Sequence, residues 1–493
     1  MKLLKEIKKH IFIYNTLLII ISGAFIKLLG LINKIIITRL LGTEGMSLYV
    51  LAFPSIILFI SLSGFSLNIT CSKLISEGLS TKRYSPKLIM KASLKLALKT
   101  SIIVETLFLL SISFLVNRLL KTPDLYLPLL MTAFLIPLVG ITDTLRGVFA
   151  GYQKMKTVAL VNIIEQIARM IFSIGGILLF SKYGIITSVT LTILALTIGE
   201  TASLVYLICK LKTLYLINFE NTENEKKAVW KMAFPTTLSR LIGSITYFLE
   251  PILNTLILLH LGYDKKVIDF DYTIINAYII PIMTICIFLS TAISTTSIPA
   301  ISEKCSDNRN ELLKIIDKIF FCAITPGLII SIILFLYPKE YLNLLFSNSI
   351  GYKFVKKYVF LFLLHYIQLP GISILQAFGK SKQVFKICTL FNLLKLVLII
   401  ILAYIPFIGS YTLFYSILIV MVFETLTIWF YIFKISSYIP NCTRLINLIL
   451  IGLFVLSIGL LMSNLINLPI IISIVLFIIF TSLILKFKIL NYK

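Results

Sequence analysis

Fourteen apolar runs, each about as long as a bilayer-spanning helix, recur along the whole chain and limit the folds open to it. A helix needs roughly 20 predominantly apolar residues to cross the hydrocarbon core of a membrane. Inside lipid the backbone must satisfy its own hydrogen bonds, which a helix does within one segment. The sequence therefore predicts an all-α polytopic membrane protein with about fourteen transmembrane helices. The runs lie near residues 11–32, 46–70, 93–117, 126–148, 158–180, 186–208, 231–260, 273–298, 315–337, 358–378, 386–404, 411–433, 444–463 and 469–487.

The composition excludes a soluble globular chain, and the charge pattern argues against a nucleic-acid-binding one. Charged residues make up 14% of the chain, whereas a soluble domain carries about 25%. The net charge is +25, but alternating spans place most Lys and Arg residues on the side of the N-terminus. Such an excess marks the cytoplasmic side of a membrane protein. We therefore expect a multi-pass protein of the bacterial plasma membrane with both termini in the cytoplasm.

The segment Met1–Gly30 has a basic start and an apolar stretch, as a secretory signal peptide does. It lacks an A-x-A-like cleavage site and runs to full spanning length. We expect it to be retained as the first span.

Charged side chains lie within or at the ends of the apolar runs. A charge at bilayer depth costs roughly 2.5–3.5 kcal/mol even on the most lenient insertion scale, so it must face a bundle interior or a wet cavity. This pattern predicts a transporter with a polar interior, in which Glu105 and Glu200 face the bundle as partners of bases. The acidic residues are Glu105, Asp143, Glu165, Glu200, Glu250 and Glu424, and the basic ones are Lys27, Lys95, Lys99, Arg146, Arg169, Lys231, Arg240, Lys318 and Lys395.

The chain repeats itself at an offset of six spans. For example, Lys27-x-x-Gly30 recurs as Arg240-x-x-Gly243. An even number of spans in each repeat makes the two copies parallel, related by an axis along the membrane normal. The sequence therefore predicts two pseudo-symmetric six-helix lobes plus two C-terminal helices.

The expected boundaries follow from this repeat. The N-terminal lobe covers 1–208, the C-terminal lobe covers 231–433, and two additional transmembrane helices with a short cytoplasmic tail cover 434–493. A cytoplasmic linker at 209–230 joins the lobes. It contains the hydrophilic stretch NFENTENEKK at 218–227.

Three motifs carry a resemblance to a known family: TRLLGTEGMSLYVLAFP at 38–54, SKLISEG at 72–78 and RGVFAGYQKMKTVALVNIIEQIARM at 146–170. The chain resembles the polysaccharide-exporter branch of the multidrug/oligosaccharidyl-lipid/polysaccharide flippase superfamily, and within it the stage V sporulation protein B group. The resemblance implies a flippase that moves a lipid-linked sugar or peptidoglycan precursor from the inner to the outer leaflet by alternating access. The implied process is cell-wall or spore-cortex synthesis.

Lys27 and Arg240 are the pseudo-symmetric bases that we expect to bind the phosphate of such a substrate. Arginine binds oxyanions through a two-pronged fork and lysine acts as a point charge. The alternative is that each side chain reaches the interface or pairs with a carboxylate. Lipid II flippases, which are close relatives, carry further cavity arginines where this chain has Asn33 and Asn276, and we count both asparagines in the predicted binding set.

Glu165 and Arg169 belong to the same predicted set and lie four residues apart, so they can meet on one helix face. The spacing favours a buried ion pair over direct substrate binding. Asp143 and Arg146, three residues apart, predict a similar pair.

A cation site is predicted in the second lobe at Glu250, Asn392 and Glu424, because relatives place an ion site among the corresponding three helices. Sodium prefers oxygen ligands, and a proton needs a carboxylate that can take it up. We expect coupling to Na⁺ or H⁺, no other cofactor and no metal centre.

Lys87, Lys91, Lys95 and Lys99 recur every four residues and form one basic stripe. Such a stripe can gather anionic lipid head groups, at about 1 kcal/mol per lysine. Anchoring on the cytoplasmic side explains the same pattern more simply.

Enzyme motifs such as H-E-x-x-H and G-x-S-x-G are absent from the sequence. We therefore expect a transporter whose partners are membrane lipids and a lipid-linked oligosaccharide or lipid II-like substrate, with no nucleic acid. Two alternatives stay open. One is a multidrug exporter of the same superfamily driven by Na⁺ or H⁺, and the other is a non-transporting scaffold among cell-wall synthesis proteins.

Overall fold

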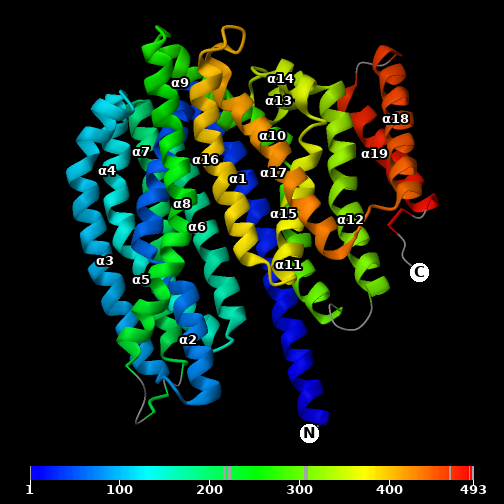
Figure 1. Ribbon diagram of the computed structural model, residues 1–493. Coiled ribbons are helices and arrows are strands. Elements are labelled where there is room, and N and C mark those ends of the chain that lie inside the picture. The colour runs from blue at the N-terminus through cyan, green and yellow to red at the C-terminus, as the bar shows by residue number, and fades with distance from the viewer. Residues whose placement is uncertain are drawn as a thin grey trace. The chain divides into compact units, whose positions relative to one another are not determined.

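The computed structural model describes residues 2–214, 217–219, 224–304, 309–465, 468–487 and 489–490. Side chains are described from Ser22 onward, except at 296, 298–300 and 302–304. Every regular element in these ranges is a helix, so the predicted all-α fold is confirmed (Figure 1).

The chain forms two compact units, Met1–Thr273 (unit 1) and Ile274–Lys493 (unit 2). Unit 1 contains α1 (Lys2–Gly64), α2 (Leu67–Thr81), α3 (Pro86–Phe114), α4 (Tyr126–Leu130), α5 (Leu135–Gly151), α6 (Met155–Phe180), α7 (Ile185–Leu211), α8 (Glu225–His260) and α9 (Lys265–Thr273). Unit 2 contains α10 (Ile280–Met283), α11 (Ile287–Lys304), α12 (Arg309–Leu336), α13 (Pro338–Phe346), α14 (Tyr352–Tyr358), α15 (Leu363–Ala377), α16 (Ser381–Ala403), α17 (Thr412–Ser436), α18 (Cys442–Leu465) and α19 (Pro469–Lys486). Short 3₁₀ or π turns are η1 (Leu115–Leu119), η2 (Pro123–Leu125), η3 (Met131–Phe134), η4 (Ser181–Tyr183), η5 (Ile274–Ile279) and η6 (Gly409–Tyr411).

Within the described residues, eleven helices are long and apolar enough to cross a membrane, or thirteen if two bent helix pairs each form one span. The predicted count of fourteen stays a prediction. The difference lies in α1, a helix of 63 residues that includes the first predicted run and most of the second. At about 1.5 Å per residue such a helix is about 95 Å long, roughly three bilayer cores. It breaks at Gly42, whose φ of 64° and ψ of −168° are not helical.

Unit 1 packs its helices closely through small residues. On α5, Gly147 faces α2, where an added Cβ would lie 2.9 Å from both the Asn68 Cα and the Cys71 Cβ. Around this contact, Leu67 and Phe149 are buried in the apolar core. Because backbone atoms form part of the contact, a larger side chain at Gly147 could not be accommodated by side-chain movement alone and would push the two helices apart.

Unit 2 ties its last two helices to the rest of the unit through a buried carboxylate. Asp317 on α12 accepts hydrogen bonds from the Tyr438 hydroxyl at 2.9 Å, the Asn441 backbone N–H at 3.1 Å and the Arg444 Nη1 at 3.0 Å. Tyr438 and Asn441 lie between α17 and α18, and Arg444 lies in the first turn of α18. The segment that leads into the additional helix pair is thereby fixed to α12.

The predicted lobe boundary at 209–230 differs from the division between the two units at Thr273. Residues 215–216 and 220–223 of this linker lie outside the described residues. Compactness and pseudo-symmetry are different properties, because a helix can belong to one repeat and pack with the other. The lobe and linker boundaries therefore stay predictions.

Gly147→Ala should destabilise the protein by about 1–3 kcal/mol, because the added methyl group overpacks the contact between α5 and α2. Gly175→Ala on α6 is the matched control, since an added Cβ there meets no atom within 4 Å. Thermal unfolding of the purified protein in detergent measures the difference. A Gly147→Ala variant as stable as Gly175→Ala would contradict the packing described here.

Candidate functional site

Arg146 binds three carboxylates on three helices of unit 1. Its Nη2 lies 2.7 Å from Glu165 Oε2 on α6 and 3.2 Å from Glu200 Oε1 on α7. Its Nη1 lies 3.5 Å from Asp143 Oδ1, one turn earlier on α5. Only 12% of the Arg146 side chain and 5% of the Glu200 side chain are exposed. We call this set, with Arg169, the Arg146 cluster.

Further contacts complete the cluster. Arg169 Nη2 pairs with Glu165 Oε1, one turn apart on α6, and the Thr142 hydroxyl donates to Glu200. The predicted pairs Glu165–Arg169 and Asp143–Arg146 are therefore confirmed as contacts. Glu200 is confirmed as the partner of a base, whereas Glu105 is half-buried and forms no ion pair within the described side chains.

Close helix packing brings these side chains together. The helices α6 and α7 pack against each other (Figure 1). A Cβ added at Gly199 on α7 would lie 2.9 Å from the Glu165 carbonyl oxygen and 3.2 Å from the Arg169 Cβ. Gly64 at the end of α1 similarly gives room to the Asp143 carboxylate, at 2.9 Å from its Oδ2. Glycine at these two positions lets the charged groups meet away from lipid.

The cluster has more negative than positive groups, since three carboxylates face two guanidinium groups. Arg240 on α8 also acts electrostatically on Asp143. It is the third cation in reach of the cluster, yet its side chain is exposed and makes no ion pair within the described residues. A phosphate that binds Arg240 would therefore compete with Asp143 for it.

The remaining predicted binding residues have different surroundings. Lys27 on α1 is exposed and forms no ion pair within the described side chains. Asn33 is buried between α1 and α6, where Ser173 Oγ donates to its Oδ1 at 3.2 Å. Asn276 is half-buried in η5 of unit 2. Their roles in substrate binding stay predictions.

The residues of the predicted cation site come from both units. Glu250 is 3% exposed on α8 of unit 1 and acts electrostatically on Tyr247 and Tyr272. Asn392 and Glu424 are half-buried on α16 and α17 of unit 2. The site therefore stays a prediction.

In unit 2, Glu424 takes part in a polar network that sequence reasoning missed. It hydrogen-bonds with Cys388 and Gln368 and interacts electrostatically with Lys395. Gln368 Oε1 also lies 2.7 Å from His365 Nδ1. Glu424 thus lies on the last of three successive helices, α15, α16 and α17, as Glu200 lies on the last of α5, α6 and α7 in unit 1.

The predicted basic stripe lies on α3. Lys91, Lys95 and Lys99 are exposed, and Lys87 is half-buried with its backbone N–H bonded to the Ile217 carbonyl at 3.2 Å. Lipid binding and anchoring both remain compatible with this exposure.

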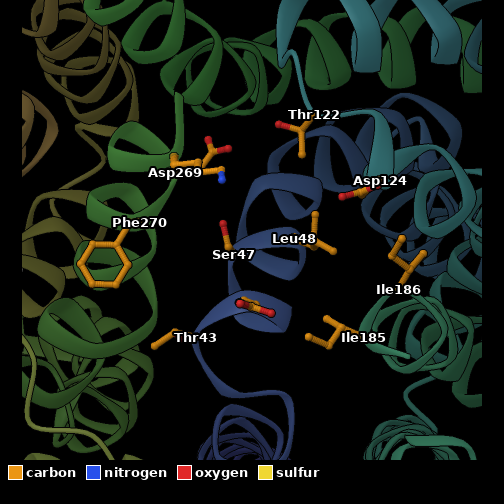
Figure 2. A pocket seen from close by; sticks show the side chains of 11 residues that line it. Thr43, Ser47, Leu48, Thr122, Asp124, Ile185, Ile186, Asp269 and Phe270 are labelled. Atoms are coloured by element: carbon orange, nitrogen blue, oxygen red, sulfur yellow. The ribbon is translucent and has the colours of Figure 1, made fainter. Parts of the chain in front are cut away.

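A cavity of 520 Å³ in unit 1 was not predicted from the sequence. Four segments line it, at the break in α1, at η2, at the start of α7 and on α9 (Figure 2). Ser47 and Leu48 lie in the middle of the view, Asp269 and Phe270 on one side, and Asp124 on the other. We call it the Ser47 cavity. The described residues, those of this cavity included, contain no group of three or more His, Cys, Asp or Glu side chains arranged to hold a metal ion.

A family model described as polysaccharide biosynthesis protein matches residues 12–305, more than half of the chain. The chain belongs to this family. As a family member it is a multi-pass membrane protein, and its resemblance to the stage V sporulation protein B group is confirmed.

Curated relatives come from Bacillus subtilis (strain 168). Stage V sporulation protein B is 28% identical over 412 residues, which cover 81% of this chain and 79% of that protein. Lipid II flippase MurJ is 24% identical over 59% of this chain and 58% of that protein.

Solved structures share the fold. Lipid II flippase MurJ in an inward closed conformation gives a TM-score of 0.67 at 16% identity, covering 95% of this chain and 99% of that one. An inward-facing multidrug resistance MATE family transporter of the MOP superfamily gives a TM-score of 0.62 at 15% identity, and the match covers 84% of this chain and 94% of that one. The chain thus shares the fold of these membrane proteins.

Arg146→Ala should lower the free energy of unfolding by about 3–5 kcal/mol, because it leaves buried carboxylates without their shared cation. Glu200→Gln should cost less, since it removes one of the excess negative charges. Lys182→Ala, which removes an exposed cation in η4, is the control. Thermal unfolding in detergent measures all three, and equal stability of Arg146→Ala and Lys182→Ala would show that the cluster does not hold the three helices together.

Proposed function

We propose that the protein is a flippase that moves a polyprenyl-diphosphate-linked sugar or peptidoglycan precursor from the inner to the outer leaflet. The observation that carries this proposal is the contrast between two kinds of intramembrane charge in unit 1. The charges of the Arg146 cluster bind one another, whereas Lys27 and Arg240 are exposed without an ion pair in the described residues.

Exposed cations at membrane depth need water or an anion, because lipid cannot solvate them. Arg240 offers a planar fork that matches a phosphate, and Lys27 adds a compact positive charge. A diphosphate between a lipid tail and a sugar is an anion that must itself cross the membrane. Cations that bind it on the way lower the barrier that hydrocarbon would impose.

A second feature of the proposal is a place for the lipid tail. Unit 2 has an apolar cavity of 310 Å³ between α12, α15 and α18. Leu328, Leu363 and Gly452 are among its lining residues, none of which is charged. A polyprenyl chain fits such a surface, and the additional helix α18 forms one wall of it.

The names of the relatives support the same class of substrate. The family is described as a polysaccharide biosynthesis protein, and one curated relative is a lipid II flippase. Sporulation is the process named for the relative with the longer match. We therefore propose a role in cell-wall or spore-cortex synthesis, in a bacterial plasma membrane.

The energy can come from gradients. An inside-negative potential favours outward movement of negative charge by roughly 2.3 kcal/mol per charge per 100 mV. We propose Na⁺ or H⁺ coupling through Glu250, Asn392 and Glu424 as an additional drive. The multidrug exporter is the second candidate, favoured by the likeness to a solved MATE family transporter.

Lys27→Ala/Arg240→Ala should reduce flipping of a fluorescent polyprenyl-diphosphate sugar in proteoliposomes at least ~10-fold, because a hydrogen bond to a charged group contributes about 1.5–3 kcal/mol. The matched control is Arg118→Ala/Lys182→Ala, which also removes two exposed cations. Exposure of the probe in the outer leaflet is the readout.

Two results would overturn the proposal. One is a wild-type protein that flips no polyprenyl-linked probe but exports a cationic dye under a Na⁺ or H⁺ gradient, which would establish the multidrug exporter. The other is normal flipping by Lys27→Ala/Arg240→Ala, which would remove both cations from the pathway.

A further inference from the structure

The Ser47 cavity has a volume in the range of small-molecule sites. Its 520 Å³ falls within the roughly 300–1,000 Å³ of pockets that bind small ligands. All of its lining residues belong to unit 1. The cavity therefore does not depend on how the two units are arranged.

The backbone turns sharply just before three of the four lining segments. Gly42, Lys121 and Gly184 have positive φ angles of 64°, 51° and 101°. Each directly precedes lining residues, which begin at Thr43, Thr122 and Ile185. Positive φ ends a helix and redirects the chain, so the cavity is built where helices stop.

The topology of the chain puts all four segments on one side of the membrane. They follow the first, third, fifth and seventh apolar runs of the sequence. Successive spans alternate in direction, so segments after odd-numbered spans share a side. With the N-terminus in the cytoplasm, as the positive-inside pattern predicts, this is the outer side.

The lining disfavours a phosphate. Glu44, Asp124 and Asp269 contribute carboxylates, whereas Lys266 is the one basic residue among the described lining residues. Asp269 already pairs with Lys265. A diphosphate brought here would meet more negative than positive groups, unlike at Lys27 and Arg240.

The same lining suits a neutral molecule with many hydroxyl groups. Carboxylates accept hydrogen bonds, and the hydroxyls of Ser47 and Thr122 can both donate and accept. The ring of Phe270 is 43% exposed and stands at the side of the cavity (Figure 2). A sugar presents two matching surfaces, hydroxyl groups at its edge and apolar C–H bonds on its face.

We propose that the Ser47 cavity binds the phosphate-free sugar portion of the lipid-linked substrate on the outer side of the membrane. The proposal rests on the proposed function and adds a second subsite to it. Lys27 lies fifteen residues before Gly42 on α1, which is about 22 Å along a helix. Because the sugar is bonded directly to the diphosphate, one substrate occupies the two sites in turn, and sugar captured outside opposes return of the head group.

Binding of two phosphate-free disaccharides, N,N′-diacetylchitobiose and maltose, to the purified full-length protein tests the proposal. Saturation-transfer NMR and calorimetry report binding without any transport. We expect one of the sugars to bind the wild type at millimolar or lower concentration. Phe270→Ala should weaken binding about 5- to 10-fold through loss of ring contact, and Phe270→Trp should restore it. Asp124→Asn should also weaken it.

Controls separate this effect from a general loss of structure. Glu340→Gln removes an exposed carboxylate in unit 2 and should bind like the wild type. All variants are compared by thermal unfolding. Sugar binding unchanged in Phe270→Ala and Asp124→Asn would overturn the proposal.

Two further outcomes also overturn it. One is a wild type that binds neither disaccharide. The other is a cavity that binds tetramethylammonium, with loss in Asp124→Asn, and no sugar. Measuring lipid flipping with the same preparations distinguishes failure of one proposal from failure of the other. A protein that flips lipid-linked sugar without binding either disaccharide refutes only the sugar subsite. A protein that binds the disaccharide and never flips the lipid refutes only the flippase.

Discussion

Charge compensation inside the membrane is the constraint on which unit 1 depends. Three helices carry carboxylates that hydrocarbon cannot solvate, and the single guanidinium group of Arg146 forms ion pairs with all three carboxylates. A single positive group shared in this way links α5, α6 and α7 in a membrane, where burial of apolar surface alone gives little driving force because lipid tails compete equally well for that surface. Closely placed glycines make the arrangement possible.

The charges of the Arg146 cluster compensate one another, so the cations of unit 1 that lie outside the cluster are the candidates for substrate binding. Lys27 and Arg240 are exposed in the same unit, and Arg240 interacts electrostatically with Asp143. An arriving phosphate can therefore exchange one interaction for another without leaving a buried charge alone. Phosphate recognition, tail binding in unit 2 and sugar binding at the Ser47 cavity then divide the substrate into chemically distinct parts.

The sequence predicted features that depend on local spacing. Apolar length predicted the helices, and intervals of three and four residues predicted the pairs of Asp143 with Arg146 and of Glu165 with Arg169. Glu200 was expected to meet a base, but Arg146 lies in another helix, and which helices pack together is not encoded in spacing. The gap between the runs at 11–32 and 46–70 predicted an interruption of the helix, and α1 breaks inside that gap at Gly42. Asn33 shows a further limit, since a membrane helix that is apolar on all sides does not reveal which face packs against Ser173. The Ser47 cavity forms where four segments that are distant in the sequence come together, and no local sequence pattern predicts that they do.

We propose that this protein recognises the phosphate of a lipid carrier and not merely its tail. Native mass spectrometry of the wild type with undecaprenyl diphosphate and with undecaprenol, which has the same tail and no charge, tests it directly. We expect the protein to retain the diphosphate and to retain far less of the alcohol. Inorganic pyrophosphate should lower retention of the diphosphate to the level of the alcohol. Equal retention of the two lipids, unaffected by pyrophosphate, would contradict it.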